Sequence, residues 1–363
     1  MRRAIKALSL KGIRSLSYTL KAPPLTPPCR HATVSTVRKD RMSTDICRFA
    51  PSASGRAHPG TLLAGLLAWL DARSRGARFV LRIEDIDPQR TTAAWSEGLI
   101  EDLTWFGLDW DQVEFQAGQA ARHTAALDRL HALGRLYPCS CTKVRLRQIC
   151  QVLPDGALVY PGHCRGRPLP DWRACPENLR CNLDGLSIAL RDESGLDLSQ
   201  TPGRDAGDPV VRRRNGTVNY QLAVVADDAA TGVTRIVRGR DIAPSTATQA
   251  ALYRLLECPL PVYRHHLLLL EPRGEKFAKF HGAVGADTLR QHLSARALCG
   301  LLASVAGLRE SAGPISPGEL LPDFNWERVR TRDQMLQWTG TCLLWRQPGQ
   351  IGLAACDPSA HSL

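Results

Sequence analysis

Beyond residue 45, short apolar runs alternate with helical spacings of apolar residues, which predicts an α/β fold. The segment "ICRFAP" (46–51) is a short apolar run that leads into a Pro-Ser-Gly turn, as expected of a strand. A helix that ends near Gly76 is predicted next. Its amphipathic spacing of i, i+3, i+4 and i+7 comes from four leucines: Leu63, Leu66, Leu67 and Leu70.

A second strand is predicted in "ARFVLRIEDID" (77–87), where the apolar run Phe79–Val80–Leu81 indicates burial on both faces. Strand, helix and strand within about 45 residues form a βαβ unit, for which a right-handed parallel crossover is expected.

The remaining pattern is coarser. Residues 92–136 are expected to be helical, with a glycine stop in "EDLTWFGLDWD". Residues 137–200 are irregular and rich in Cys, Pro and Gly, which predicts an inserted subdomain. Residues 219–242 have a pattern of apolar residues that predicts strands, and residues 245–257 are expected to be helical. The periodicity of apolar residues weakens after residue 330.

Charge is unevenly distributed. The net charge is +12, but residues 1–41 hold ten Lys or Arg and one acid, Asp40, and supply nine of these charges. The remainder is only mildly basic, so a nucleic-acid surface would have to be a local patch. Residues 1–41 are interpreted as a disordered extension or as an organellar targeting segment, and the extension is favoured.

Two further sequence features bear on membrane association and on the cellular compartment. No apolar run approaches the ~18 residues of a membrane span, so no membrane partner is expected. Most of the twelve cysteines are scattered, and no secretory leader with an apolar core is found, so a reducing, cytoplasmic compartment is expected.

The stretch "RFAPSASGRAHPGTLLAGL" (48–66) places a glycine-rich turn before a helix. Such a turn exposes backbone N–H groups at the positive end of the helix dipole, which suits a phosphate. Gly55 and Gly60 would permit close approach, and His58 could donate to a phosphoryl oxygen. A tight loop whose histidine caps the helix is an equally good interpretation.

Two further motifs are ambiguous by themselves. Glu84 and Asp85 in "RIEDID" follow a crossover strand, where α/β sheets place ligands, but a surface pair with Arg82 or a helix cap is the commoner explanation. Lys276 and Lys279 in "RGEKFAKFHG" (273–282) could close over a triphosphate or form a solvated basic turn.

A metal site is predicted at Cys139, Cys141 and Cys164. Three clustered thiolates in an irregular region suit structural zinc better than free thiols. The fourth ligand would be Tyr160 or His163, and zinc chemistry alone favours His163.

Together and in this order, the four motifs resemble class I aminoacyl-tRNA synthetases of the glutamyl type. "RFAPSASG", "HPGT" and "RIEDID" are similar to the opening of that catalytic domain, with "HPGT" in the place of the HIGH signature. "YQLAVVADDAATGVTRIVRGRDI" (220–242) is similar to its central segment, and "KFAKF" stands where the KMSKS loop would be. The resemblance runs from about Cys47 to Arg330 and implies a Rossmann-like catalytic domain.

Within that group the shortened glutamyl-Q tRNA(Asp) synthetase family is the better match. Only 83 residues follow Phe280, too few for the helical anticodon-binding region of a full glutamyl enzyme. The Cys-x-Cys … Tyr-x-x-x-Cys pattern also resembles the zinc site of that family, which has a tyrosine ligand. The resemblance therefore implies Tyr160 as the fourth ligand, with His163 as the fallback.

The resemblance also implies roles for individual residues. Arg48 and Arg238 would bind a glutamate carboxylate and Glu84 the α-ammonium group. The full amino-acid pocket would be Arg48, Phe49, Ala50, Pro51, Ser52, Glu84, Tyr220 and Arg238. ATP would be bound by His58, Gly60, Thr61, Lys276 and Lys279, with Mg²⁺ balancing its charge.

The implied reaction is ATP-dependent activation of L-glutamate without tRNA, followed by transfer to the queuosine at the wobble position of tRNA(Asp). A monomeric enzyme is expected.

The sequence departs from the family pattern in four places: Ala53 in place of a proline, "HPGT" itself, Ala278 in place of a hydroxyl residue, and a longer Cys141–Tyr160 spacing. Two alternatives stay open: a conventional glutamyl-tRNA synthetase with a degenerate C-terminus, and a catalytically silent, zinc-stabilised RNA-binding paralogue.

The expected organisation follows from these assignments. Five segments are predicted: 1–44, a basic, disordered extension; 45–136, the first half of the Rossmann-like catalytic domain; 137–200, the inserted zinc-binding and acceptor subdomain; 201–330, the second half with the KMSKS-like loop; and 331–363, a C-terminal tail.

Overall fold

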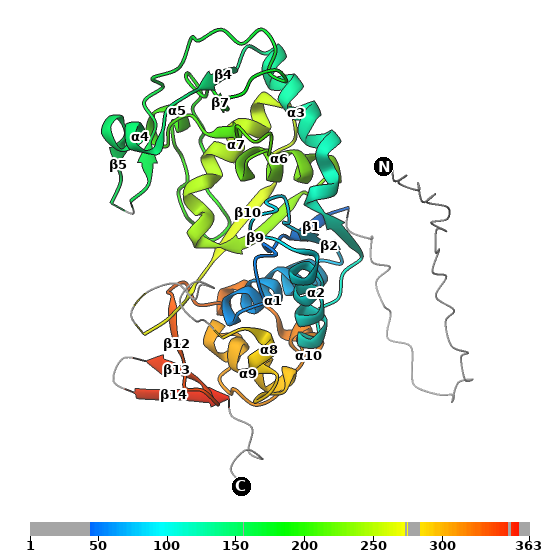
Figure 1. Ribbon diagram of the computed structural model, residues 1–363. Coiled ribbons are helices and arrows are strands. Elements are labelled where there is room, and N and C mark those ends of the chain that lie inside the picture. The colour runs from blue at the N-terminus through cyan, green and yellow to red at the C-terminus, as the bar shows by residue number, and fades with distance from the viewer. Residues whose placement is uncertain (1–43, 155, 273, 275–283, 348–349, 356–363) are drawn as a thin grey trace, which may run out of the picture. The chain divides into compact units, whose positions relative to one another are not determined.

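A five-stranded sheet with helices on both faces lies at the centre of the protein (Figure 1). The computed structural model describes residues 44–154, 156–272, 274, 284–347 and 350–355. The strands are β1 (Ile46–Phe49), β2 (Arg78–Ile83), β3 (Gln112–Phe115), β9 (Arg235–Gly239) and β10 (Val262–His266). Their order is β10-β9-β1-β2-β3 and every neighbouring pair is parallel, which confirms the expected α/β fold.

The predicted βαβ unit is present as β1, α1 (Pro59–Ser74) and β2, and the buried run Phe79–Leu81 lies in β2 as expected. Gly76, with φ of +63°, follows the end of α1. The four predicted leucines of α1 are buried, but so are Leu62 and Trp69 on its other sides. The helix is therefore enclosed around most of its circumference and is not the amphipathic surface helix that the spacing predicts.

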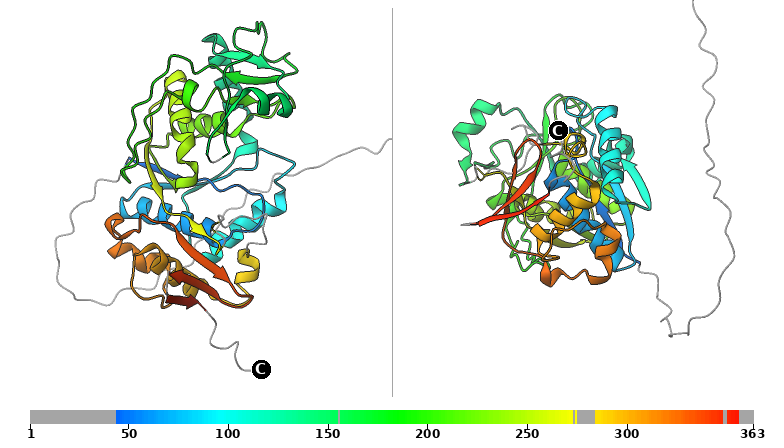
Figure 2. Two further views of the ribbon diagram at one scale, coloured as in Figure 1. Left: turned by 90° about the vertical axis from the view of Figure 1, so that its left-hand side faces the viewer. Right: turned by 90° about the horizontal axis from the view of Figure 1, so that it is seen from below.

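The buried hydrophobic side chains form two main cores. The helices that contribute to them lie on the two sides of the sheet, as the further views also show (Figure 2). The first core contains α1, α2 (Ala93–Phe106), α8 (Ala286–Leu289), α9 (Ala295–Ala306) and α10 (Pro317–Leu320). The second contains α3 (Ala120–Ala132), α6 (Tyr220–Thr231) and α7 (Thr246–Leu255). Strand β2 is buried from Phe79 to Ile83, which explains why it contains an apolar run and not an alternating sequence.

Smaller elements occupy residues 136–212. The antiparallel sheet β4-β7-β8 combines β4 (Leu136–Cys139), β7 (Asn178–Cys181) and β8 (Val210–Arg212). Between the first two strands lie α4 (Lys143–Ile149) and the hairpin β5 (Gln151–Val152) with β6 (Leu158–Val159), and α5 (Pro202–Asp205) precedes β8. Tyr137, Cys139, Cys150, Tyr160 and Cys164 form a small core of their own here.

A second sheet joins β11 (Leu269–Leu270) to the C-terminal strands β12 (Gln334–Trp338), β13 (Leu343–Gln347) and β14 (Gln350–Ala355). Leu336, Leu343 and Trp345 are buried in the first core, so this sheet belongs to the folded body. The short 3₁₀ helices are η1 (Gln116–Gln119), η2 (Arg240–Ser245), η4 (Leu321–Asp323) and η5 (Trp326–Arg328).

Three expectations about elements were wrong. The strand texture over 219–242 is instead helix α6, capped by Asn219 and ended by Gly232 with φ of +75°, and only β9 is a strand. Short apolar runs fit either element, and here the caps decide. Strand β3 interrupts the helices of 92–136, and β12–β14 occupy the segment after residue 330 where the weak periodicity predicts none. The helix over 245–257 and the glycine stop, Gly107, are confirmed.

In the described part of the chain, no helix is long and apolar enough to cross a membrane.

Candidate functional site

A cavity of about 540 Å³ lies at the carboxyl ends of β1, β2, β9 and β10, where parallel sheets place ligands. We call it the first cavity. Every predicted amino-acid or ATP residue in the described part of the chain lines it: Arg48, Phe49, Ala50, Pro51, Ser52, His58, Gly60, Thr61, Glu84, Tyr220 and Arg238. Lys276 and Lys279 lie outside the described residues.

The turn after β1 is tied directly to the end of β2. The Glu84 amide donates to the Pro51 carbonyl (3.0 Å), and the Ala53 amide donates to the Glu84 carbonyl (3.2 Å). A proline at position 53 could not make the second bond, because it has no N–H. Ala53 is fully buried, so the substitution noted in the sequence leaves the turn well packed. These bonds fix Glu84 at the edge of the first cavity.

The Glu84 side chain is partly buried where it lines the first cavity. Ser52 Oγ donates to its Oε2 at 3.3 Å. Burial raises the pKa of Glu84 to about 7, although Arg48 and Arg82 act in the opposite direction. A carboxylate in such a position gains from a cationic ligand that replaces its lost water. Tyr220, whose pKa is raised by burial and by Glu84, keeps its phenolic proton as a donor.

Arg48 is held in place by the carboxylate of Asp228, a residue that no sequence motif singled out. Its Nε and Nη2 donate to the two oxygens of Asp228, each at 3.3 Å, and Arg82 Nη1 donates to Asp228 Oδ1 at 2.5 Å. All three side chains are buried. Two guanidinium groups therefore share the Asp228 carboxylate, and Arg82 Nε also pairs with the buried carboxylate of Glu114 at 3.4 Å. Burial would lower the pKa of Arg48, but Asp228, Tyr220 and Glu84 together outweigh burial and raise that pKa.

Arg238 is a buried cation held only by neutral groups among the described residues. Its Nη1 donates to Gln249 Oε1 (2.8 Å), its Nη2 to Thr246 Oγ1 (2.7 Å) and its Nε to His265 Nε2 (3.0 Å). Burial lowers the pKa of Arg238. A guanidinium has five N–H groups, so two remain for a ligand. A buried charge without a counterion favours an anionic ligand.

His265 is kept neutral by burial and by Arg238, which lower its pKa to about 4. Its Nδ1 proton is directed to Asp192 Oδ2 at 2.8 Å, and the same oxygen accepts from the His265 amide at 2.8 Å. The lone pair on Nε2 therefore faces Arg238. Asp192, Asp228 and His265 were missed because their partners are distant in sequence and no local motif marks them.

His58 caps α1, because its Nδ1 accepts from the Thr61 amide at 3.3 Å. This confirms the structural interpretation of the motif. The neutral imidazole then carries its proton on Nε2, so the cap is compatible with donation to a phosphate. A Cβ at Gly60 would lie 3.0 Å from the His58 ring, so this glycine makes room for the folded-back histidine.

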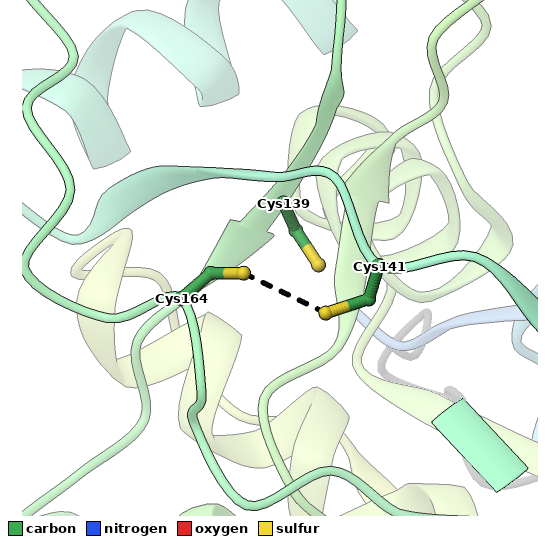
Figure 3. A group of neighbouring side chains, drawn as sticks. All are labelled: Cys139, Cys141 and Cys164. Atoms are coloured by element: carbon green, nitrogen blue, oxygen red, sulfur yellow. Dashed lines mark hydrogen bonds between the residues drawn. The ribbon is translucent and has the colours of Figure 1, made fainter. Parts of the chain in front are cut away.

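The predicted metal residues converge as Figure 3 shows. The sulfurs of Cys139, Cys141 and Cys164 lie within 4.8 Å of one another, and those of Cys141 and Cys164 are 3.6 Å apart. The Tyr160 hydroxyl lies 3.7 Å from Cys139 Sγ and 3.9 Å from Cys141 Sγ. His163 lines a hollow with Cys141 and Cys164, but its ring nitrogens are not part of the group.

This donor set fits one zinc ion. Three sulfurs and one phenol oxygen supply four donors, and Arg180 stands beside them to offset negative charge. Its Nε donates to Cys139 Sγ at 3.3 Å, and its guanidinium carbon lies 3.7 Å from the centre of the Tyr160 ring.

Comparison with known proteins identifies the family to which this chain belongs. Residues 46–159 and 176–293 match the catalytic-domain model of tRNA synthetases class I (E and Q). A glutamyl-Q tRNA(Asp) synthetase of Symbiobacterium thermophilum is 42% identical over 301 residues, which cover 78% of this chain and 93% of that protein. One from Nitratidesulfovibrio vulgaris is 38% identical over 308 residues, covering 78% and 93%.

A solved structure shares the fold. The glutamate tRNA ligase of Elizabethkingia meningosepticum has a TM-score of 0.67 and 22% identity, covering 82% of this chain and 68% of that one. The chain therefore belongs to the glutamyl-Q tRNA(Asp) synthetase family and is a ligase of the class I aminoacyl-tRNA synthetase type.

Proposed function

We propose that this ligase activates L-glutamate with ATP in the absence of tRNA and transfers it to the queuosine at the wobble position of tRNA(Asp). The observation that carries the first step is Arg238, a buried guanidinium with only neutral partners among the described residues, on a cavity that Glu84 also lines. Such a cavity selects a ligand with both a carboxylate and an ammonium group.

Recognition of glutamate needs two anion contacts and one cation contact at fixed separations. Arg238 and Arg48 supply the anion contacts, and Glu84 takes the α-ammonium group. The Tyr220 hydroxyl donates to the bound amino acid. Phe49, Ala50, Pro51 and Ser52 form the wall against which it lies.

ATP would lie against the N-terminus of α1. The Gly60 and Thr61 region offers the positive end of the helix dipole, and His58 Nε2 donates to a phosphoryl oxygen. Lys276 and Lys279 are proposed to close from the other side, and Mg²⁺ bound with ATP would neutralise phosphate charge. Catalysis then rests on positioning and electrostatics, with no protein nucleophile.

The reaction has two balanced steps. A glutamate α-carboxylate oxygen attacks the α-phosphorus of ATP, the bond to the bridging oxygen of the β-phosphate breaks, and pyrophosphate leaves. The acceptor hydroxyl oxygen then bonds to the carbonyl carbon of glutamyl-adenylate, the carbonyl–phosphate linkage breaks, and AMP leaves with the electron pair. The hydroxyl proton passes to the departing phosphate.

The choice of acceptor is supported by the relatives, which are named for tRNA(Asp) and its modified base.

We also propose one structural zinc held by Cys139, Cys141, Tyr160 and Cys164. Its chemistry is to cross-link a subdomain whose own core is small, and it takes no part in either step. We further propose that the enzyme acts as a monomer.

Glutamate-dependent ATP–pyrophosphate exchange, with and without tRNA, tests the proposal. Exchange without tRNA, abolished by Glu84→Ala while tRNA binding persists, is the expected result. Exchange that requires tRNA would instead identify a conventional glutamyl-tRNA synthetase. No exchange under either condition would identify a catalytically silent RNA-binding paralogue.

A further inference from the structure

Part of the wall of the first cavity takes no part in the contacts proposed above. This part, the β9–β10 wall, consists of Gly239, Asp241, Ile242 and residues 266–269. Its two segments lie in close contact, since a Cβ at Gly239 would lie 3.1 Å from Leu268 Cδ2. The shape of the β9–β10 wall therefore depends on how closely Leu268 is held against the Gly239 backbone.

A carboxylate from the C-terminal part of the chain joins these two segments. Asp333 Oδ1 accepts from the Leu268 amide at 2.6 Å and from Arg240 Nε at 2.8 Å. Arg240 Nη2 lies 2.6 Å from the same oxygen, and Arg240 stands between two residues of the β9–β10 wall. Asp333 itself is not among the described residues that line the first cavity. One carboxylate oxygen outside the cavity lining therefore ties both segments together.

The backbone of β12 reinforces this connection. The Gln334 amide donates to the Leu268 carbonyl at 3.0 Å, and β12 then runs parallel to β11 with Gln334 opposite Leu269. Both backbone polar groups of Leu268 are thus bonded to residues 333 and 334. Leu336 of β12 is buried in the first core, so Asp333 precedes a strand that is itself anchored. A carboxylate held on a packed element keeps its partners in place with little further loss of entropy.

We propose that Asp333 is a positioning residue for ATP. It fixes the β9–β10 wall, against which lies the part of ATP that does not reach the N-terminus of α1. Asp333 acts through Leu268 and Arg240 and touches neither substrate. The C-terminal segment, which the sequence predicts to be a tail, thereby takes part in the activation step. This assignment rests on the proposed function, because it requires ATP in the first cavity.

The variant Asp333→Ala tests the proposal, and Asp323→Ala, which removes an exposed carboxylate from the same part of the chain, is its matched control. ATP–pyrophosphate exchange gives kcat and the KM values for ATP and glutamate, and calorimetric titration with ATP alone gives its Kd. We expect Asp333→Ala to raise the KM and Kd for ATP about tenfold, because the Leu268 amide loses a charged acceptor. The KM for glutamate and kcat should change less than about twofold. The control should keep the wild-type values.

Two further variants separate the contacts of Asp333. Asp333→Asn keeps an oxygen for the Leu268 amide but loses the charge that pairs with Arg240, so the KM for ATP should rise only about threefold. Arg240→Ala combined with Asp333→Ala should exceed the effect of Asp333→Ala alone by less than about twofold, since the two residues act through one contact. Effects that multiply in the double variant would show that they act separately, which overturns the proposed bridge.

The remaining outcomes distinguish this proposal from the proposed function. Urea denaturation identifies the variants that are folded under the assay conditions, and if Asp333→Ala is not among them, Asp333→Asn carries the same test. Wild-type ATP affinity in a folded variant overturns the positioning role and leaves the proposed function standing. An equal rise in the KM for ATP and for glutamate also overturns it, because a merely structural role would affect both substrates. A wild-type protein that binds ATP but catalyses no exchange overturns the proposed function, whereas weaker ATP binding by Asp333→Ala would still support the positioning role.

Discussion

The imidazole Nε2 of His265 accepts a hydrogen bond from Nε of Arg238 at 3.0 Å, and both side chains are buried. A neutral acceptor holds the guanidinium in place without cancelling its charge. Asp192 enforces this arrangement from the opposite side of the ring by accepting the Nδ1 proton at 2.8 Å. Arg238 is thereby positioned for a substrate carboxylate by two residues that do not themselves line the first cavity.

Asp192→Asn should raise the KM for glutamate about tenfold in ATP–pyrophosphate exchange and change kcat less. An asparagine presents either an oxygen or an NH₂ group to the ring, so it no longer enforces the Nδ1-protonated tautomer. ¹⁵N NMR of the histidines should show that tautomer for His265 in the wild type and its loss in the variant. Asp197→Asn, an exposed site on the same loop, is the control. An unchanged KM together with a changed tautomer would remove Asp192 from the positioning of Arg238.

Glutamate use should depend on pH through Glu84, whose pKa is raised by burial to about 7. The ionised carboxylate is the form that pairs with the α-ammonium group, and protonation removes it as pH falls. We expect kcat/KM for glutamate to fall about tenfold for each pH unit below about 7, since this parameter reports the free enzyme. Glu84→Gln should be much less active and should lack this break. A wild-type profile that stays flat from pH 8 to pH ~5.5 would argue against the assignment.

Asp228→Ala should lower the free energy of unfolding by about 3–5 kcal/mol, because it removes the carboxylate that pairs with buried Arg48 and leaves buried Arg82 with Glu114 alone. Urea denaturation measures this change. Asp184→Ala, which removes an exposed carboxylate 3.8 Å from Arg165, should cost less than about 1 kcal/mol. Equal costs for the two variants would show that the buried cluster does not stabilise the fold as described.

Purified protein should contain one zinc per chain, and Tyr160→Phe should weaken zinc binding by about tenfold or more in competition with a chelator. His163→Ala should leave the affinity unchanged, because its ring nitrogens are not part of the sulfur cluster. Elemental analysis gives the stoichiometry. The reverse order of the two variants would make His163 the ligand, and well under one zinc per chain would remove the site.

Local patterns were sufficient where neighbouring residues make the structure. The strand–helix–strand unit from β1 to β2 is encoded by apolar runs, leucine spacing and a glycine stop within 40 residues of chain. The same holds for the three clustered cysteines, whose short separations bring them together. Helix α6 was misassigned because Val224 and Val225 suit a strand, and only packing in the second core and the caps make this segment a helix.

The sequence by itself determined the residue types of the first cavity and their order along the chain, because each lies in a short motif at a strand end or helix start. Only the tertiary structure decided how these side chains are held. Asp228 reaches Arg48 from 180 residues away, and Asp192 reaches His265 from 73. Such pairs form only when the sheet brings distant elements together and removes water between them, and neither spacing nor composition carries that information.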